Sequence, residues 1–400
     1  MNVVHVVRRF TASKWGGVEE YVLNLVRQQR EEGMNSWVFS TSALREESDN
    51  FLEKWVSYFD YKYPYLWLNR AQSLSLDNFF GNPLCFSMLK KINSMDVDVL
   101  HIHTNARFVL PLIKCVKSKK NCKVIVHEHS GVSSKIKVEK PVVSKLNGSY
   151  GKLFDLYYKK DFLYKKVDSF ILNNLEDLSH YRKNYPNAKS NFLPCFVNPL
   201  FFDEVEESRD SIRSRYGFSA KDPLFLVVGR IQQLKNQLSV VKALPFYPEA
   251  KLLIVGPKVD SAYFSEILSF IKTNKLEERV YFRDPLRFDD VERIKVLKAV
   301  DFCLFPSVYD SLGIVILEAW AAKCEVISSK LPQWFKYGEG LMNFADFENP
   351  EKLAHSLRES FLQPSEIKRS RLEKAFSKVS KEFSLPTHFK EIKTLYGWRK

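Results

Sequence analysis

The sequence has no long apolar run. No stretch of its 400 residues reaches the roughly 18 consecutive apolar residues that a membrane-spanning helix needs. The apolar part of the N-terminal segment MNVVHVVRRF is also too short for a secretory signal. We therefore expect a cytoplasmic protein, one that can lie at the inner face of the cell membrane without crossing it.

Recognisable ligand motifs for metals are also missing. The six cysteines form no C-x-x-C pair, which fits reduced cysteines in a core or on a surface. No D-x-D or His/Cys ligand cluster in the sequence suggests a metal site. The sequence therefore predicts neither a bound metal nor a cofactor.

Negative charge is in short supply. The chain has 61 Lys and Arg against 47 Asp and Glu, a formal net charge of +14. Such an excess favours anionic partners, namely phosphorylated ligands, nucleic acid or an acidic membrane surface. The basic residues are spread along the chain, with no helix-turn-helix, zinc-finger or RNP-type pattern. We therefore expect a phosphorylated ligand and no nucleic acid.

Short apolar runs alternate with helical patterns along almost the whole chain, which predicts parallel sheets covered by helices on both faces. The ten runs fall into two groups, so the predicted fold class is α/β, with two doubly wound Rossmann-like domains facing each other across a cleft. The predicted strands are Val3–Val7, Ser36–Ser40, Val97–His101, Lys123–His127, Ser169–Leu172, Leu224–Val228, Lys251–Val255, Arg279–Phe282, Asp301–Phe305 and Glu325–Ser328.

A polar, charged stretch at residues 198–222 separates the two groups of runs. We place the first domain at residues 1–200 and the second at residues 201–385. The aromatic C-terminal segment, residues 386–400, has a helical pattern, and we expect it to pack back onto the first domain.

Ligands of such sheets bind beyond the carboxyl ends of the strands, so the residues that follow each strand are informative. After the first strand, Gly16 and Gly17 come directly before a helix that starts near Val18. Glycines let the backbone approach a ligand, and the first turn of a helix binds anions. A simple tight turn explains the pair equally well.

Two cations follow the Leu224–Val228 strand. Arg230 and Lys235 stand five positions apart in the segment GRIQQLKN, and two such cations suit a diphosphate. A solvated charged loop is the alternative interpretation.

The segment FPSVYDSLGIVILEAWAAK, residues 305–323, starts as a strand and continues as a helix. The N–H groups of Leu312, Gly313 and Ile314 would be unpaired in its first turn and could bind a second anion. Asp310 and Glu318 could accept hydrogen bonds from sugar hydroxyls. Alternatively, Asp310 caps the helix and Glu318 lies on a solvated face.

These segments together resemble glycosyltransferase family 4, whose members are retaining, nucleotide-sugar-dependent enzymes of the GT-B fold. The "GR", four residues, "KN" pattern is followed by Asp310, seven residues and Glu318, close to the family's Glu, seven residues, Glu. The Gly-Gly loop and the segments DVLHIHT, VHEHS and NFLPCFVNPLFF are similar to family landmarks in the same order.

The resemblance implies roles for residues of the second domain, which would bind the donor. Arg230 and Lys235 would bind the diphosphate and stabilise the leaving group, and Asp310 would contact the donor sugar. Glu318 would bind the ribose hydroxyls, and Arg283 falls where the nucleobase is held. The backbone from Ser311 through Leu312 and Gly313 to Ile314 would hold phosphate oxygens.

In the first domain, which would bind the acceptor, the resemblance places Gly16 and Gly17 near the phosphates. His103 and His129 would lie on the acceptor side, with His129 joining Arg230, Lys235 and Asp310 as a catalytic residue. His127, two positions earlier, is the alternative to His129.

The implied function is retaining transfer of a sugar, from a UDP-sugar in preference to a GDP-sugar, to a hydroxyl of a glycan or lipid-linked acceptor. Bacterial surface-polysaccharide synthesis is the implied setting, and no metal is required. The alternatives are a sugar-nucleotide-binding protein without turnover and another GT-B enzyme such as a nucleotide-sugar epimerase.

Two aromatic and basic stretches, Phe51–Trp67 and Tyr150–Lys166, suggest peripheral contact with an anionic membrane, although a buried core with solvated lysines explains them equally well.

Four positions depart from the family pattern. Asp310 replaces the usual Glu, Asp284 a usual Gly, and Lys323 and Glu325 replace the Gly and Pro that normally follow the helix. The resemblance therefore leaves the donor sugar open.

Overall fold

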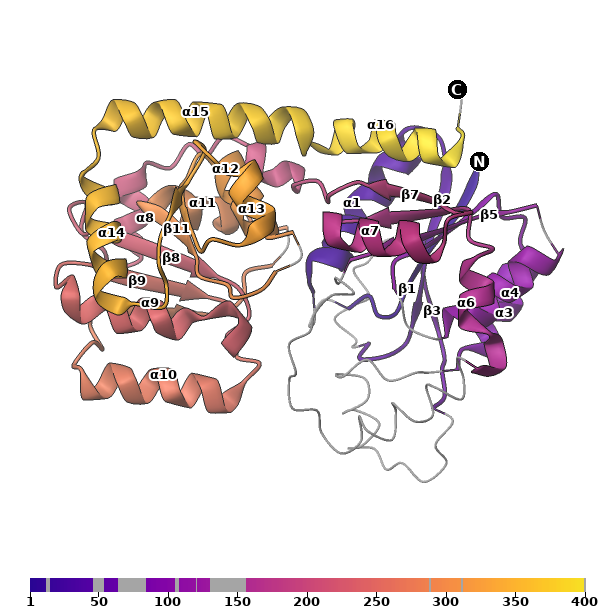
Figure 1. The fold of residues 1–400 in the computed structure, drawn as a ribbon, viewed down its shortest axis with the longest axis horizontal. Coiled ribbons are helices and arrows are strands. Elements are labelled where there is room, and N and C mark those ends of the chain that lie inside the picture. Colours follow the sequence, from indigo (N-terminus) through magenta and orange to yellow (C-terminus); the bar gives the residue numbers. More distant parts are fainter. Residues whose placement is uncertain are drawn as a thin grey trace. The chain divides into compact units, whose positions relative to one another are not determined.

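The computed structural model describes residues 1–11, 15–45, 54–63, 84–104, 108–119, 121–129, 156–287, 289–310 and 312–398. These residues form two α/β units (Figure 1). Unit 1 comprises Met1–Pro194 together with Phe389–Lys400, and unit 2 comprises Cys195–His388. The C-terminal residues therefore belong to the same unit as the N-terminus.

Unit 1 is built on a parallel sheet in the order β3-β2-β1-β4-β5-β6-β7. The order reverses between β1 and β4, which are hydrogen-bonded neighbours with His5 opposite His101. The strands are β1 (Asn2–Val7), β2 (Asn35–Thr41), β3 (Val56–Phe59), β4 (Val99–Ile102), β5 (Lys123–Glu128), β6 (Ser169–Leu172) and β7 (Lys189–Phe192). The helices are α1 (Gly17–Glu31), α3 (Phe86–Ser94), α4 (Val109–Lys119), α6 (Lys160–Tyr164), α7 (Leu175–Asn184) and, from Phe389 on, α16 (Leu385–Tyr396).

The two faces of this sheet differ in chemistry because successive side chains of a strand alternate between them. One face carries aliphatic residues such as Val4 and Val6, which share a core with α3, α4, α6 and α7. The other face carries the histidines of β1, β4 and β5, which contact side chains of α1 and α16. Gly33, with φ of 89°, ends α1 in the left-handed conformation that glycine adopts at little cost.

Unit 2 repeats the architecture with a parallel sheet in the order β10-β9-β8-β11-β12-β13. The strands are β8 (Leu224–Val228), β9 (Lys251–Val255), β10 (Val280–Arg283), β11 (Phe302–Phe305), β12 (Glu325–Ser328) and β13 (Asn343–Phe344). The helices are α8 (Arg209–Arg215), α9 (Gln237–Ala243), α10 (Ser261–Thr273), α11 (Glu292–Ala299), α12 (Ile314–Ala321), α13 (Pro332–Tyr337), α14 (Pro350–Leu362) and α15 (Ser365–Glu382), with 3-10 turns η3 (Pro199–Phe202), η4 (Gln233–Lys235) and η5 (Leu244–Phe246).

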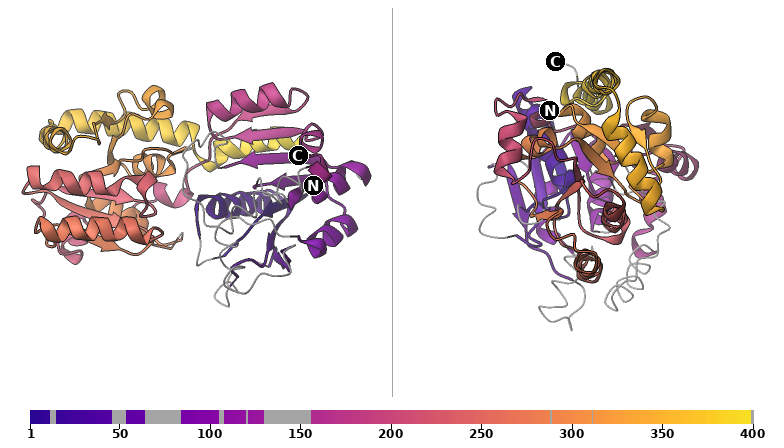
Figure 2. Two further views of the ribbon diagram at one scale, coloured as in Figure 1. Left: turned by 60° about the horizontal axis from the view of Figure 1, so that its bottom comes forward. Right: turned by 90° about the vertical axis from the view of Figure 1, so that its left-hand side faces the viewer.

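Alternation along β8 again sorts the core into two layers. Leu224 and Leu226 pack in a cluster that includes α11 and α12. Phe225 and Val227 pack in a second cluster, which includes α9 and α10. In each unit the strands lie between helices (Figure 2), the arrangement that near-continuous apolar strands require.

The predicted α/β class with two doubly wound domains is confirmed, and each predicted strand has a counterpart within two residues of its expected bounds. The prediction of five strands per domain is wrong, because the described residues add β3, β7 and β13. These three strands stand at sheet edges, where sequences are less apolar. Among the described residues, no helix combines the length and the apolar character that crossing a membrane would require.

Candidate functional site

The candidate donor residues of unit 2 gather at the point where its strand order reverses. β8 and β11 are neighbours in the sheet, and their connections leave in opposite directions. The loop after β8 carries Arg230 and Lys235, and the loop after β11 carries Asp310. The N–H of Val308 donates to the carbonyl oxygen of Leu234 over 3.0 Å, which ties the two loops together. Open α/β sheets bind ligands at such reversal points.

Lys235 and Asp310 form a salt bridge between these loops. The side chain of each is about one-fifth exposed, and the Lys235 ammonium also lies 5.5 Å from the centre of the Phe305 ring. The aliphatic part of Lys235 passes about 3.8 Å from the position a Cβ on Gly229 would take. The cation is therefore held in place beside the Gly229 backbone.

The start of α12 differs from the expectation at one N–H group. Gly313 has φ of 68°, and its N–H donates to Asp310 Oδ1 over 3.1 Å, so the prediction that this N–H is unpaired is wrong. Asp310 therefore caps the turn before the helix, as the alternative interpretation held. The N–H groups of Leu312 and Ile314 have no hydrogen-bond partner in the described part of the chain. Ser311 lies outside the described residues.

Glu318 is buried within unit 2, so its alternative placement on a solvated helix face is wrong. Its Oε1 lies 2.9 Å from Nη2 of Arg293, which comes from α11. The guanidinium of Arg293 also lies 4.7 Å from the centre of the Phe201 ring. Sequence reasoning missed Arg293, because only the packing of α11 against the start of the unit brings it to Glu318.

The remaining donor candidates are exposed. Arg230 directly follows Gly229, and its side chain makes no hydrogen bond or ion pair to the described residues. Arg283 ends β10, with its guanidinium 5.8 Å from the centre of the Tyr216 ring. Both arginines thus follow carboxyl ends of strands in the same parallel sheet, where their charges are available to an anion.

Two departures from the family pattern have structural counterparts. Lys323 adopts φ of 55°, a conformation that glycine would adopt more cheaply. Glu325 is buried and forms a salt bridge with Arg371 of α15. Burial raises the pKa of the Glu325 carboxyl, and the Arg371 guanidinium opposes that shift. Arg371 Nη1 also donates to Asn343 Oδ1 over 2.9 Å, so the carboxylate at this position is anchored to α15.

In unit 1, Gly16 and Gly17 stand at the start of α1, as the sequence predicts. A carboxylate also stands there: Glu19 is buried, and its Oε1 lies 3.7 Å from Nε of Arg9. Burial raises the pKa of the Glu19 carboxyl. The first turn of α1 therefore already holds an acidic group, which makes it a weaker anion site than the start of α12.

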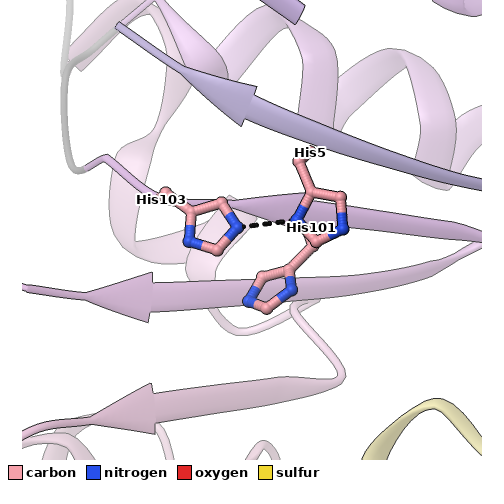
Figure 3. A group of neighbouring side chains, drawn as sticks. All are labelled: His5, His101 and His103. Atoms are coloured by element: carbon pink, nitrogen blue, oxygen red, sulfur yellow. Dashed lines mark hydrogen bonds between the residues drawn. The ribbon is translucent and has the colours of Figure 1, made fainter. Parts of the chain in front are cut away.

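Five histidines form a cluster on the α1 face of the unit 1 sheet. They come from three adjacent strands and the residues just after them: His5, His101, His103, His127 and His129. Figure 3 shows three of them, with His103 directed at His5. His127 is fully buried, whereas His129 is partly exposed. His103, predicted to lie on the acceptor side, is buried, and so is His101.

Hydrogen bonds connect the cluster. His5 Nδ1 lies 2.8 Å from His103 Nε2, and His103 Nδ1 lies 3.1 Å from His129 Nε2. Burial lowers the pKa of His5 to about 4 and the pKa of His127 to about 3, and it places the pKa of His103 well below its ordinary value. These three rings are therefore neutral at pH 7.

Sequence reasoning found no His cluster with metal-ligand spacing, yet the fold brings two triads together. His5, His101 and His103, and likewise His103, His127 and His129, each offer nitrogens within 4.8 Å of one another. The rings are largely stacked, however: the centroids of His127 and His129 are 3.9 Å apart at 22°. Lone pairs in stacked rings do not converge on one point, so this geometry fits a hydrogen-bonded ladder better than a metal centre.

Two family models match the chain. "Glycosyltransferase Family 4" matches residues 15–199, and "Glycosyl transferases group 1" matches residues 208–378. Together they span most of both units.

Curated relatives match part of the chain. An N-acetylgalactosaminyltransferase of Campylobacter jejuni, which acts on a diphospho-undecaprenol-linked glycan according to its name, is 25% identical over 41% of the chain and 42% of its own length. A D-inositol 3-phosphate glycosyltransferase of Xylanimonas cellulosilytica is 30% identical over 34% of the chain and 32% of its own length. The matches thus span less than half the length of these relatives.

Solved structures match over the full length. Anabaena HepE, in complex with UDP and glucose, superposes with a TM-score of 0.74 at 16% identity, covering 100% of both chains. A glycosyltransferase of Rickettsia africae superposes with a TM-score of 0.72 at 17% identity, covering 99% of this chain and 97% of its own. Likeness at this level of identity describes the fold.

Proposed function

Because the chain belongs to the group 1 glycosyltransferases and has their GT-B fold, we propose that it transfers a sugar from a UDP-sugar to a hydroxyl of a glycan or lipid-linked glycan. The Lys235–Asp310 salt bridge carries the proposal, because it fixes a cation beside the first turn of α12 at the reversal point of the unit 2 sheet. The UDP in the HepE structure and the lipid-linked substrate named for the Campylobacter relative support the choice of donor and acceptor.

The main requirement of the reaction is to stabilise the negative charge that develops on the leaving diphosphate. The C1–O bond of the donor breaks, the acceptor oxygen attacks the same face of the sugar, and negative charge grows on the diphosphate until its departing oxygen takes up the proton of the acceptor hydroxyl. Lys235, Arg230 and the N–H groups of Leu312 and Ile314 would stabilise that charge without reorganising. Asp310, which holds Lys235, would exchange part of that contact for a donor-sugar hydroxyl.

Glu318 would bind the ribose hydroxyls through its carboxylate. Its salt bridge with Arg293 fixes the position of the carboxylate, which suits a hydrogen-bond acceptor for two neighbouring hydroxyls. Arg283 would lie at the nucleobase. In unit 1, Gly16 and Gly17 would approach the phosphates, and His103 and His129 would lie on the acceptor side.

The setting that we propose is bacterial surface-polysaccharide assembly, with peripheral contact with an anionic membrane and no requirement for a metal. Leu156, Tyr157 and Phe162 are exposed apolar residues of unit 1 and are interspersed with lysines, a combination that suits an acidic lipid surface. Residues 51–53, 64–67 and 150–155 of the two aromatic stretches lie outside the described residues.

A panel of UDP- and GDP-sugars with lipid-linked and free glycan acceptors tests the proposal, with release of nucleoside diphosphate as the readout. We expect acceptor-dependent release of UDP, lowered about 100-fold or more by Lys235→Ala, the typical cost of removing one preorganised group that stabilises developing charge. Lys272→Ala, on the exposed side of α10, is the matched control.

The outcomes separate the alternatives. Thermal stabilisation by UDP with no release from any donor would indicate a binding protein without turnover. Conversion of the donor to another sugar nucleotide without an acceptor would indicate an epimerase. Unchanged release by Lys235→Ala would overturn the assigned role of this cation.

A further inference from the structure

We propose that Gln29 acts through His5 and His103 as a positioning residue for His129, fixing its ring proton on Nε2 and its lone pair on Nδ1, where a substrate hydroxyl would replace the Asn173 amide as the donor. The inference rests on the proposed function, which places His129 on the acceptor side. It goes further by assigning a proton position to each ring and a remote residue that controls it.

The assignment starts at the Gln29 end of the ladder. Gln29 Nε2 donates to the hydroxyl of Tyr396 over 3.2 Å, so its Oε1 faces His5 and accepts from His5 Nε2–H over 2.8 Å. A neutral imidazole carries one proton, so His5 Nδ1 is an acceptor. It therefore accepts from His103 Nε2–H, and His103 Nδ1 in turn accepts from His129 Nε2–H.

The other end of the ladder gives the same answer independently. Asn173 Oδ1 lies 3.2 Å from His127 Nε2, and Asn173 Nδ2 lies 3.5 Å from His129 Nδ1. An amide that accepts from His127 Nε2–H presents its N–H to His129 Nδ1. His129 Nδ1 is then an acceptor, and its proton is on Nε2. The opposite direction would require both amides to turn over together.

Burial makes the ladder rigid. Gln29 and His5 are fully buried, and His103 is 4% exposed, so water does not offer these rings a substitute partner. Each proton position then depends on the next one, because reversing one ring leaves two N–H groups or two lone pairs facing each other. Gln29, which does not contact His129, thereby sets what the partly exposed ring of His129 can bind.

Long-range ¹⁵N–¹H NMR of the imidazoles in the full-length protein tests the proposal without any ligand. We expect His5, His103 and His129 each to carry the proton on Nε2. In Gln29→Met, which removes the acceptor for His5, we expect the His129 signals to shift towards a mixture of tautomers. Gln28→Met, at the neighbouring position outside the ladder, should leave them unchanged.

A His129 proton on Nδ1 in the wild-type spectrum would overturn the proposal even if Gln29→Met does not fold. Release of UDP in the panel assay supplies the second readout, and we expect Gln29→Met to lower it at least tenfold. Unchanged release alongside a tautomer mixture would also overturn the positioning role. An unreactive wild-type protein with the expected tautomers would instead count against the proposed function alone.

Discussion

At the scale of single residues, two charges of the candidate donor site, Lys235 and Glu318, are already paired, whereas Arg230 and Arg283 are exposed. Lys235 is held by Asp310, and Glu318 is held by Arg293. A ligand that binds there competes with, or adds to, existing contacts rather than meeting solvated side chains. Pairing holds each group in place, which is the condition for electrostatic stabilisation without reorganisation.

Removing Arg293 should leave the buried carboxylate of Glu318 without its ion-pair partner and so destabilise the fold. For Arg293→Met we expect the free energy of unfolding to fall by roughly 3 kcal/mol, because breaking a buried ion pair leaves an uncompensated charge. Urea denaturation measures it. The control is Arg287→Met, which breaks an exposed pair with Asp289 and should cost less than about 1 kcal/mol. Equal losses in the two variants would contradict the role of Arg293.

The same pairs show how far the sequence could predict the site. Arg230, Lys235, Asp310 and Glu318 follow strands or start helices, positions that a strand pattern reveals. Their partners are a different matter, since Arg293 lies on another helix and only tertiary packing brings it to Glu318. The alternation in HIHT and HEHS predicts two pairs of histidines on one face, but His5 and Gln29 join them only through strand register and the packing of α1.

At the scale of elements, the starts of α1 and α12, which the sequence predicts to be two similar anion sites, differ in their charged residues. The first turn of α12 has no acidic residue, whereas that of α1 contains Glu19 and Glu20. The presence of Glu19 and Glu20 can be read from the sequence. The position of the Glu19 carboxylate at the helix start cannot, because it depends on burial and on the contact with Arg9.

Gly17→Ala separates a functional role of the α1 start from a structural one. A Cβ at Gly17 would meet no atom within 4 Å, so we expect unfolding to cost the same or up to about 1 kcal/mol more, because alanine favours helix over glycine. If the Gly17 backbone approaches the donor phosphates, UDP release should fall about tenfold. Unchanged release in a stable variant would remove Gly17 from the site.

At the scale of the whole molecule, the neutral histidines make stability depend on pH. The pKa of His5 is about 4 in the folded protein, below its ordinary value of 6.5. Between these two pH values the unfolded chain therefore binds more protons than the folded one. Burying neutral His5 therefore makes the free energy of unfolding depend on pH. Its contribution is fully present above pH 6.5 and is lost as the pH falls towards 4, which lowers the free energy of unfolding by about 3 kcal/mol from His5 alone. Glu19 and Glu325, with raised pKa, oppose this loss near pH 4.5.

Urea denaturation at pH 7 and pH 5 checks this expectation. His5→Asn should flatten the profile, whereas His355→Asn, at a highly exposed histidine of α14, should keep it. A wild-type protein equally stable at both pH values would show that the buried rings do not resist protonation.

Membrane contact is a second property of the molecule as a whole. We expect sedimentation with vesicles of phosphatidylcholine and phosphatidylglycerol, weakened by salt, and little with phosphatidylcholine alone. Replacing Leu156 and Phe162 by Ser should weaken binding about tenfold or more, given the apolar area that each can bury. The same change at the exposed Leu362 and Ile367 of unit 2 is the control, and equal effects would contradict the assignment of this surface.

The chain passes from unit 1 to unit 2 and returns for its last helix, α16. During synthesis, therefore, the strands of unit 1 emerge before unit 2, but the helix that covers part of their histidine face is translated after unit 2. Until Tyr396 is synthesised, its hydroxyl cannot hydrogen-bond His101, and unit 2 can fold before unit 1 is complete. Order of translation and order of completion are thus reversed in this protein.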